Sequence, residues 1–136
     1  MLRVLAFVLV AGVAADDAPF RVVVHRSNPV TSLSRAELSA IYMKRTRSWA
    51  GGGEIVPVEQ PVRSRTREQF SQLVHGKSVA YVTRYWQRLI FSGRAVPPAE
   101  VRSSQAVLDF VKNNAGAIGY IEGDPPPGVN VIAVRP

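Results

Sequence analysis

The sequence predicts an α/β fold in which helices flank a compact mixed sheet. Short β-branched runs alternate with longer segments whose apolar residues recur at helical spacing. The predicted order is strand, helix, strand, three helices, strand and strand. The chain has 136 residues and no cysteine. It is therefore long enough for one domain with a buried core, and neither disulfides nor thiolate metal sites contribute to it.

The first fifteen residues have the pattern of a secretory leader. Arg3 supplies a short positive start, residues 4–13 are apolar, and Val13-Ala14-Ala15 resembles a cleavage site. The apolar stretch is shorter than the roughly 20 residues of a membrane span. We therefore predict a signal peptide at 1–15, a domain at 16–136, no transmembrane segment after cleavage, and a periplasmic or secreted location. A retained anchor or a buried first strand is the alternative.

The first strand and the start of the first helix are clearly marked in the sequence. Phe20–His25 is nearly continuously β-branched and apolar, which predicts a strand buried on both faces. Ser34 and Glu37 have the spacing of a capping box, and Leu33 and Leu38 that of a hydrophobic staple. A helix should therefore begin after Ser34.

Glycine turns and serine caps set the expected limits of the later elements. A flexible turn at Gly51-Gly52-Gly53 precedes the apolar strand Ile55–Val58. Ser78 is a predicted N-cap for a long helix, and Gly93 a left-handed residue at its end. The remaining predicted elements are a helix at 104–112 and strands at 117–121 and 129–134.

The start of the second helix breaks a local rule. Ser64 is a good N-cap, yet Arg65 and Arg67 fall in the first turn, where the helix dipole disfavours each cation by about 0.3–1 kcal/mol. An anion bound to the free N–H groups would reverse that penalty. We predict an oxyanion site whose candidate residues are Arg63, Ser64, Arg65, Thr66 and Arg67. The alternative is a solvated basic turn that Glu68 partly compensates.

The formal net charge of +7 favours anionic partners, but charge alone does not select among phosphate-like ligands, nucleic acid and anionic lipid. The basic run Lys44-Arg45-Thr46-Arg47, with Trp49, has the composition of a nucleic-acid contact or of a solvated turn. Arg84 and Arg88 lie on one stripe of the long helix. This stripe is either the solvent-exposed face of the helix or a contact surface for an acidic partner or an anionic membrane.

Three motifs follow one another along the chain. The first comprises Ser27-Asn28-Pro29-Val30, then Leu33 to Leu38, Ile41 to Lys44 and Trp49. The second is Ser64-Arg65-Thr66-Arg67 with Phe70, and the third is Gly116-Ala117-Ile118-Gly119-Tyr120. In this order they resemble the Asn-Pro…Leu…Ile-Phe-x-Gly…Trp segment, the Ser-Gly-Thr-Arg…Phe phosphate motif and the closing strand of the phosphate-binding proteins of phosphate ABC transporters, within the type 2 periplasmic-binding-protein superfamily.

The resemblance implies a solute-binding protein that holds inorganic phosphate or a similar oxyanion without covalent chemistry or a cofactor. It implies an ABC transporter permease or another envelope protein as a partner. The departures concern length and the site. Family members are about twice as long and have two lobes; here Arg65 replaces the motif's glycine, Gln60 stands at the preceding arginine, and no acidic residue falls between Gln60 and Arg67.

Catalytic and metal sites lack support in the sequence. His25 and His75 have no metal-ligand spacing, Ser64 lacks a nucleophile elbow, and the acidic residues are scattered. We therefore predict a protein that is not an enzyme and binds no specific nucleic acid. The first hypothesis is an exported oxyanion-binding domain of phosphate transport. The alternative is a degenerate solute-binding fold that serves as a cell-envelope protein-interaction module without a ligand.

Overall fold

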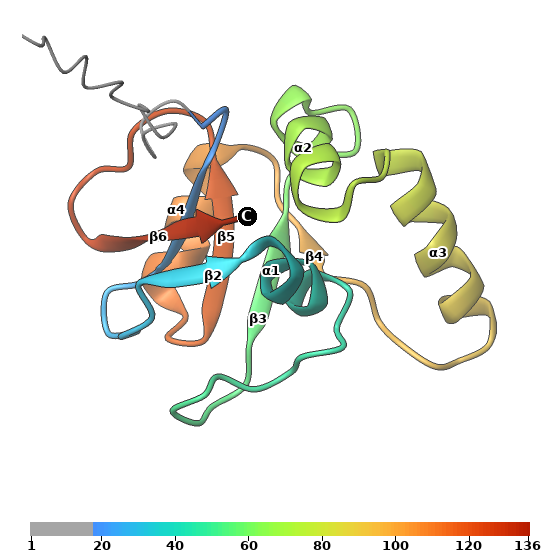
Figure 1. Cartoon of the computed structure of the whole chain (residues 1–136), viewed down its shortest axis with the longest axis horizontal. Helices are drawn as coiled ribbons and strands as arrows, with labels where there is room; N and C mark the ends of the chain where they lie inside the picture. The colour runs from blue at the N-terminus through green and yellow to red at the C-terminus, as the bar shows by residue number, and fades with distance from the viewer. Residues whose placement is uncertain (1–17) are drawn as a thin grey trace, which may run out of the picture.

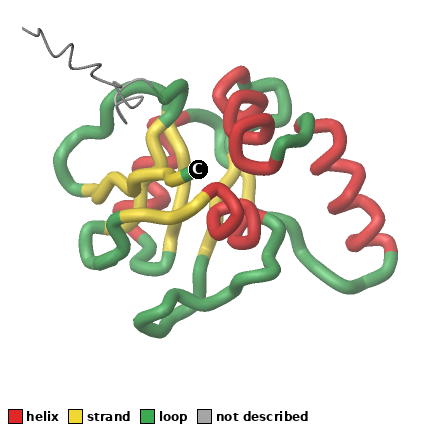
Figure 2. The backbone as a smooth tube through the Cα atoms, viewed as in Figure 1, coloured by secondary structure: helices red, strands yellow, loops and turns green. Residues whose placement is uncertain are grey.

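The computed structural model describes residues 18–136, so the predicted leader at 1–15 lies outside the described residues. The chain forms a sheet with helices on both of its faces (Figures 1 and 2). The elements, in order, are β1 (Arg21–His25), β2 (Ser32–Ser34), α1 (Arg35–Tyr42), β3 (Val56–Glu59), α2 (Arg65–Phe70), the π-helical turn η2 (Ser71–His75), α3 (Val79–Phe91), β4 (Ala99–Glu100), α4 (Ser104–Asn113), β5 (Ala117–Ile121) and β6 (Val129–Arg135).

The six described strands form one mixed sheet in the order β2-β6-β1-β5-β3-β4. β1 runs antiparallel to both of its neighbours, whereas β2 is parallel to β6, and β3 is parallel to both β5 and β4. The other five strands therefore all point the same way. As a result, the carboxyl ends of β3, β4 and β5 lie at one edge of the sheet, the usual place for a ligand in such folds.

The sheet separates two apolar clusters, which confirms that β1 is buried on both faces. Val22 and Val24 pack in the cluster that contains α1 and η2 residues, whereas Val23 packs in the cluster that contains α4 residues. The alternation follows from the two-residue period of a strand. In Figure 1, α4 lies behind the sheet and α1 in front of it.

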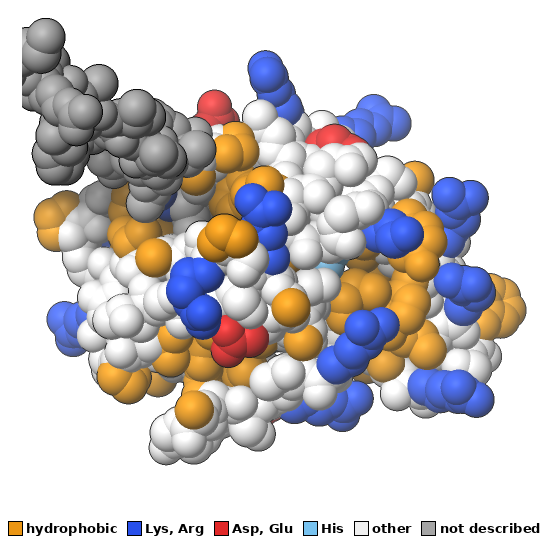
Figure 3. Space-filling view, in the orientation of Figure 1, with side chains coloured by type: hydrophobic (Ala, Val, Ile, Leu, Met, Phe, Trp, Pro, Cys, Tyr) orange, Lys and Arg blue, Asp and Glu red, His pale blue; other side chains and the backbone are white. Residues whose placement is uncertain are grey.

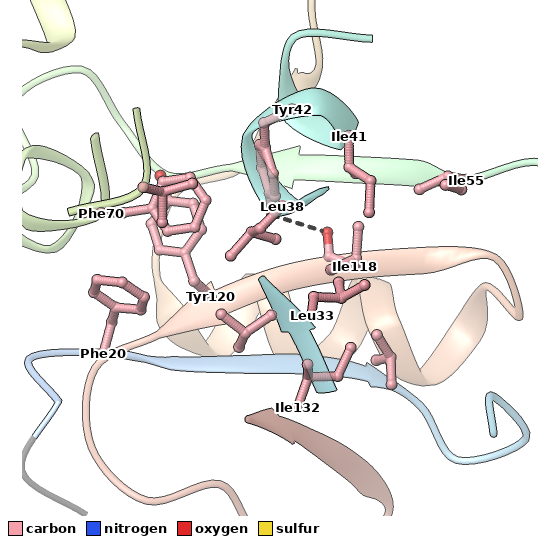
Figure 4. Packing of buried hydrophobic residues seen from close by; sticks show 13 residues of the cluster. Phe20, Leu33, Leu38, Ile41, Tyr42, Ile55, Phe70, Ile118, Tyr120 and Ile132 are labelled. Atoms are coloured by element: carbon pink, nitrogen blue, oxygen red, sulfur yellow. Dashed lines mark hydrogen bonds between the residues drawn. The ribbon is translucent and has the colours of Figure 1, made fainter. Parts of the chain in front are cut away.

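Four aromatic rings fill the larger cluster (Figure 4). Phe70 stacks on Tyr120 at a centroid distance of 4.0 Å, and Tyr42 and Phe20 meet Phe70 edge-on. The Tyr42 hydroxyl lies 3.1 Å from the carbonyl oxygen of Val58 and 3.2 Å from that of Ile118. Through Phe70, this packing fixes the helix that begins at the predicted site.

The predicted caps are confirmed. The Ser34 hydroxyl accepts from the Glu37 N–H, and the Glu37 carboxylate accepts from the Ser34 N–H, each at 3.0 Å. Ser78 caps α3, and Gly93 beyond its end has φ 68°, in the left-handed region.

Three features differ from the prediction. The strand expected at Ile55–Val58 runs from Val56 to Glu59, so its last residue is a carboxylate. The second helix continues as the π-helical turn η2. The short strands β2 and β4 were missed because two or three residues carry no periodicity, and only pairing with β6 and β3 defines them.

Helix α3 lies at the outer edge of the molecule, apart from the sheet (Figure 1). Val82 and Trp86 on its inner side pack with Met43 in a small separate cluster. One face of α3 therefore packs against the rest of the protein, and the opposite face is exposed.

The closing motif needs its second glycine for packing. Gly119 faces α4, where an added Cβ would overlap the Val107 side chain and lie 2.9 Å from that of Val58. We expect Gly119→Ala to lower the free energy of unfolding by about 1–3 kcal/mol through overpacking. Gly51→Ala is the matched control, because nothing lies within 4 Å of its added Cβ. Urea denaturation that gave equal midpoints for both variants would contradict this packing.

Candidate functional site

The candidate site lies at the carboxyl edge of the sheet, where β3 leads into α2. The β3–β4 register places Glu59 directly beside Glu100. Two like charges side by side on neighbouring strands repel each other. A cation is therefore needed at this edge.

Arg67 supplies that cation from the first turn of α2. Its Nε lies 3.5 Å from Glu59 Oε2 and its Nη1 lies 3.2 Å from Glu100 Oε2. Nη1 also donates to the carbonyl oxygen of Gln60 at 2.9 Å. Arg67 is buried, with a relative exposure of 8%, and its guanidinium lies between these partners.

Glu59 is the buried member of this cluster. It is 5% exposed, and its carboxylate accepts a hydrogen bond from the Tyr120 hydroxyl. Burial raises the pKa of Glu59, while the Arg67 guanidinium and the Tyr120 hydroxyl oppose that rise. Burial, together with the Glu59 charge, also raises the pKa of Tyr120, so the hydroxyl remains a proton donor.

Gln60 joins three elements at the same edge. Its amide nitrogen donates to the Tyr120 carbonyl oxygen at 2.9 Å and to the Ser104 hydroxyl at 3.0 Å. Its amide oxygen accepts from the Ser64 hydroxyl at 3.3 Å. Gln60 therefore connects β5, the start of α4 and the start of α2.

The structure separates the five predicted residues into an inner and an outer set. Ser64 is the N-cap of α2, and its hydroxyl accepts from the Arg67 N–H at 3.2 Å. Thr66 and Arg67 are buried, whereas Arg63 and Arg65 are exposed. The N–H groups of the first helical turn have no carbonyl partner within the helix. Because Ser64 caps the Arg67 N–H, the first-turn backbone donors without a carbonyl partner are those of Arg65 and Thr66, and the exposed Arg63 and Arg65 lie at this helix start.

Sequence reasoning missed four residues of the cluster, namely Glu59, Gln60, Glu100 and Tyr120. One signal was present, because Glu59 is a charged residue at the end of an otherwise apolar strand. No acidic residue lies between Gln60 and Arg67, but Glu59 directly precedes this stretch. The contribution of Glu100 has no local signal, since it arrives through strand pairing.

A cavity of about 170 Å³ adjoins this cluster and separates it from α3. Arg67, Glu100 and Trp86 are among its lining residues, together with Thr83, whose hydroxyl oxygen is buried without a hydrogen-bond partner. Within residues 18–136, no group of three or more histidines and carboxylates is arranged to hold a metal ion.

Among the helices of residues 18–136, none is both long enough and apolar enough to span a bilayer.

The comparison with known families gives one match. Residues 17–125 match the model of the PBP superfamily domain. No curated protein is significantly similar to the chain in sequence.

Solved structures of phosphate-binding proteins share this fold. One is from Clostridium perfringens, described as a phosphate ABC transporter substrate-binding protein with bound phosphate, at 25% identity and a TM-score of 0.68. Another is an ABC-type phosphate transport receptor from Vibrio cholerae, at 25% identity and a TM-score of 0.67. PstS from Borrelia burgdorferi, at 12% identity and a TM-score of 0.62, shows the fold alone.

The structural matches cover most of this chain but a smaller share of each neighbour. They span 85% of this chain but only 44%, 46% and 47% of the three neighbours. The chain therefore corresponds to less than half of each of these proteins.

The position of Arg67 predicts a large effect on stability. We expect Arg67→Ala to lower the free energy of unfolding by about 3–5 kcal/mol, because Glu59 would remain buried beside Glu100 without a cation. Arg65→Ala, on the exposed side of the same turn, should change it by less than about 0.5 kcal/mol. Urea denaturation at pH 7 measures both variants.

Acid should partly rescue Arg67→Ala. A carboxyl whose pKa is raised by folding binds protons more tightly in the native state, so its protonation stabilises the fold as the pH falls. The deficit against wild type should shrink as the pH falls from 7 towards 4.5. A deficit that stays constant over this range would contradict the assigned role of Glu59.

His75 gives a pH dependence of the opposite sign. Burial, with smaller contributions from Arg45 and Arg67, lowers its pKa to about 4, and its Nδ1 lies 2.7 Å from the Ser39 hydroxyl. His75 binds a proton more readily in the unfolded chain. Its contribution should therefore lower the free energy of unfolding of wild type by about 3 kcal/mol between pH 6.5 and 4. His75→Gln should remove this component. Equal slopes of unfolding free energy against pH in the two proteins would refute it.

Proposed function

Since the chain belongs to the family defined by the PBP superfamily domain, we propose that it is a solute-binding protein for inorganic phosphate or a similar oxyanion. The start of α2 carries this proposal. Ser64 caps the helix, and Arg63 and Arg65 are exposed beside its first-turn N–H groups. An anion at this point would offset the unfavourable contact between the arginines and the helix dipole.

The five residues take different roles in this proposal. The N–H groups of Arg65 and Thr66 donate to the anion, and the guanidiniums of Arg63 and Arg65 supply charge. Ser64 and Thr66 are the proposed hydroxyl donors, and the Ser64 hydroxyl would exchange its 3.3 Å hydrogen bond to Gln60 for one to the anion. Arg67, which Glu59 and Glu100 hold, fixes the position of the turn. The proposed function is reversible binding with no covalent step and no cofactor, and it is not an enzymatic one.

Export and transport complete the proposal. The leader at Met1–Ala15 would direct the domain at 16–136 to the periplasm or the exterior. An ABC transporter permease would then receive the released anion. Support comes from the structural neighbours described as phosphate transport proteins, of which this chain matches less than half.

One observation favours a second function. The Arg67 guanidinium is satisfied by two carboxylates of the chain itself, so it needs no ligand for charge balance. A domain that binds no oxyanion would then act through its surface, as a protein-interaction module of the cell envelope. This alternative retains the fold and assigns no ligand to the α2 turn.

Phosphate titration separates the two functions. In low salt, calorimetry of wild type should detect phosphate binding, and Arg63→Gln/Arg65→Gln should weaken it about tenfold, a loss of roughly 1.4 kcal/mol. Arg84→Gln/Arg88→Gln is the matched control, because it removes the same charge from α3 and should retain the affinity. Both positions on the α2 turn are exposed, so thermal stability should not change.

The outcomes are distinct. A flat wild-type trace at millimolar phosphate would exclude the oxyanion function and support the interaction module. Equal weakening in both double variants would show a general charge effect rather than a site at the α2 turn. Sulfate and arsenate titrations under the same conditions would define which oxyanion binds best.

A further inference from the structure

The outer side of α3 is a basic and apolar surface that the proposed phosphate site does not use. From Lys77 to Pro98 the chain contains four cations and no acidic residue. Arg84 and Arg88 are exposed on the same helical stripe as Tyr81 and Phe91. These four residues and Gln87 line a shallow depression along the helix. Figure 3 shows Lys and Arg side chains around apolar ones on this side of the molecule.

Three apolar side chains project at the end of this helix. Phe91 is 95% exposed, Val96 is 74% exposed and Ile90 is 49% exposed. Phe91 ends α3, and Val96 lies in the loop that follows. We name these three residues the apolar tip. Exposed apolar groups gathered in this way mark interaction surfaces.

Cations surround the apolar tip on two sides. Arg84 and Arg88 precede it on α3. On the other side, a cavity of about 570 Å³ has Ile90 and Val96 in its wall together with Lys44, Arg47 and Arg94. One carboxylate, that of Glu54, also lines this cavity. We name the five cations the basic rim.

We propose that the apolar tip and the basic rim bind the surface of an anionic membrane. Arginine and lysine at such a surface attract anionic headgroups, while aromatic and aliphatic side chains enter the boundary with the acyl chains. The proposal concerns lipid as the source of the phosphate groups and is independent of oxyanion binding at α2.

Shape and charge favour lipid over other occupants. A second copy in a symmetric contact would bring Arg84 and Arg88 against the same arginines, and like charges would oppose pairing. A Phe91 side chain that is 95% exposed projects from the surface, which suits insertion into a soft interface. An acidic protein would use the cations and needs a matching pocket for the tip.

Vesicle co-sedimentation of the full chain tests this proposal. Wild type should sediment with vesicles of phosphatidylglycerol and phosphatidylcholine in a one-to-two ratio, and much less with phosphatidylcholine alone. Phe91→Ser should reduce the partition coefficient about tenfold by removing apolar burial. Arg84→Gln/Arg88→Gln should reduce it by at least tenfold. The apolar stretch at residues 4–13 is present in every variant, so differences between variants report on the α3 surface.

Matched controls make the test specific. Arg26→Gln/Arg102→Gln removes two exposed cations elsewhere and should sediment like wild type. Phe91→Leu should restore most of the binding lost in Phe91→Ser. Added salt should weaken binding, because the headgroup contacts are screened.

Three results would overturn the proposal. Wild type could fail to sediment with the anionic vesicles, or the Phe91 and Arg84/Arg88 variants could sediment as wild type does. Alternatively, a soluble acidic polypeptide could bind with the same sensitivity to Arg84→Gln/Arg88→Gln while vesicles do not, which would identify an acidic protein as the partner. The phosphate titration of Arg84→Gln/Arg88→Gln is a separate measurement, so failure here leaves the α2 site unaffected.

Discussion

The buried ion pair between Arg67 and Glu59 is the interaction on which this edge of the structure depends. Pairing β3 with β4 places Glu59 beside Glu100, and a guanidinium between them relieves their repulsion. Removing water from these charges is costly, and the cost is offset only if their remaining hydrogen-bonding groups are satisfied. The Tyr120 hydroxyl and the Gln60 carbonyl oxygen provide those bonds.

The same arrangement explains how a cation comes to lie in the first turn of a helix. Arg67 is unfavourable there as a local residue, but its side chain extends away from the turn to carboxylates on two strands. The tertiary contact therefore reverses the local penalty for Arg67. Arg65 has an exposed side chain, and it remains the part of the sequence anomaly for which an external anion is the proposed explanation; Arg63, also exposed, directly precedes the N-cap.

The carboxyl edge of the sheet and the outer side of α3 form two surfaces of different chemistry. At the carboxyl edge of the sheet, two exposed arginines lie at a helix start above a buried cluster of charges, and this is the proposed oxyanion site. Along α3, cations border projecting apolar side chains, which suits an extended interface. The helix reaches this position because Val82 and Trp86 attach only its inner face, through a cluster separate from the sheet's two apolar clusters.

The sequence by itself determined the elements with strong local signals. The caps at Ser34, Ser64 and Ser78 begin helices because their hydroxyls satisfy first-turn N–H groups, and a continuous β-branched run makes β1 a buried strand. The three motifs, in order, were sufficient to identify the family. These signals lie within a few residues of one another, so no knowledge of the fold is needed to interpret them.

Only the tertiary structure decided which charges meet. Glu59 and Glu100 are 41 positions apart, and nothing local to either indicates that both contact Arg67. The two-residue strand β4 exists only because β3 offers it hydrogen-bonding partners. The sequence marked the α2 turn as unusual, whereas the division into a buried Arg67 and exposed Arg63 and Arg65 depends on strand register, a long-range property that local propensities do not encode.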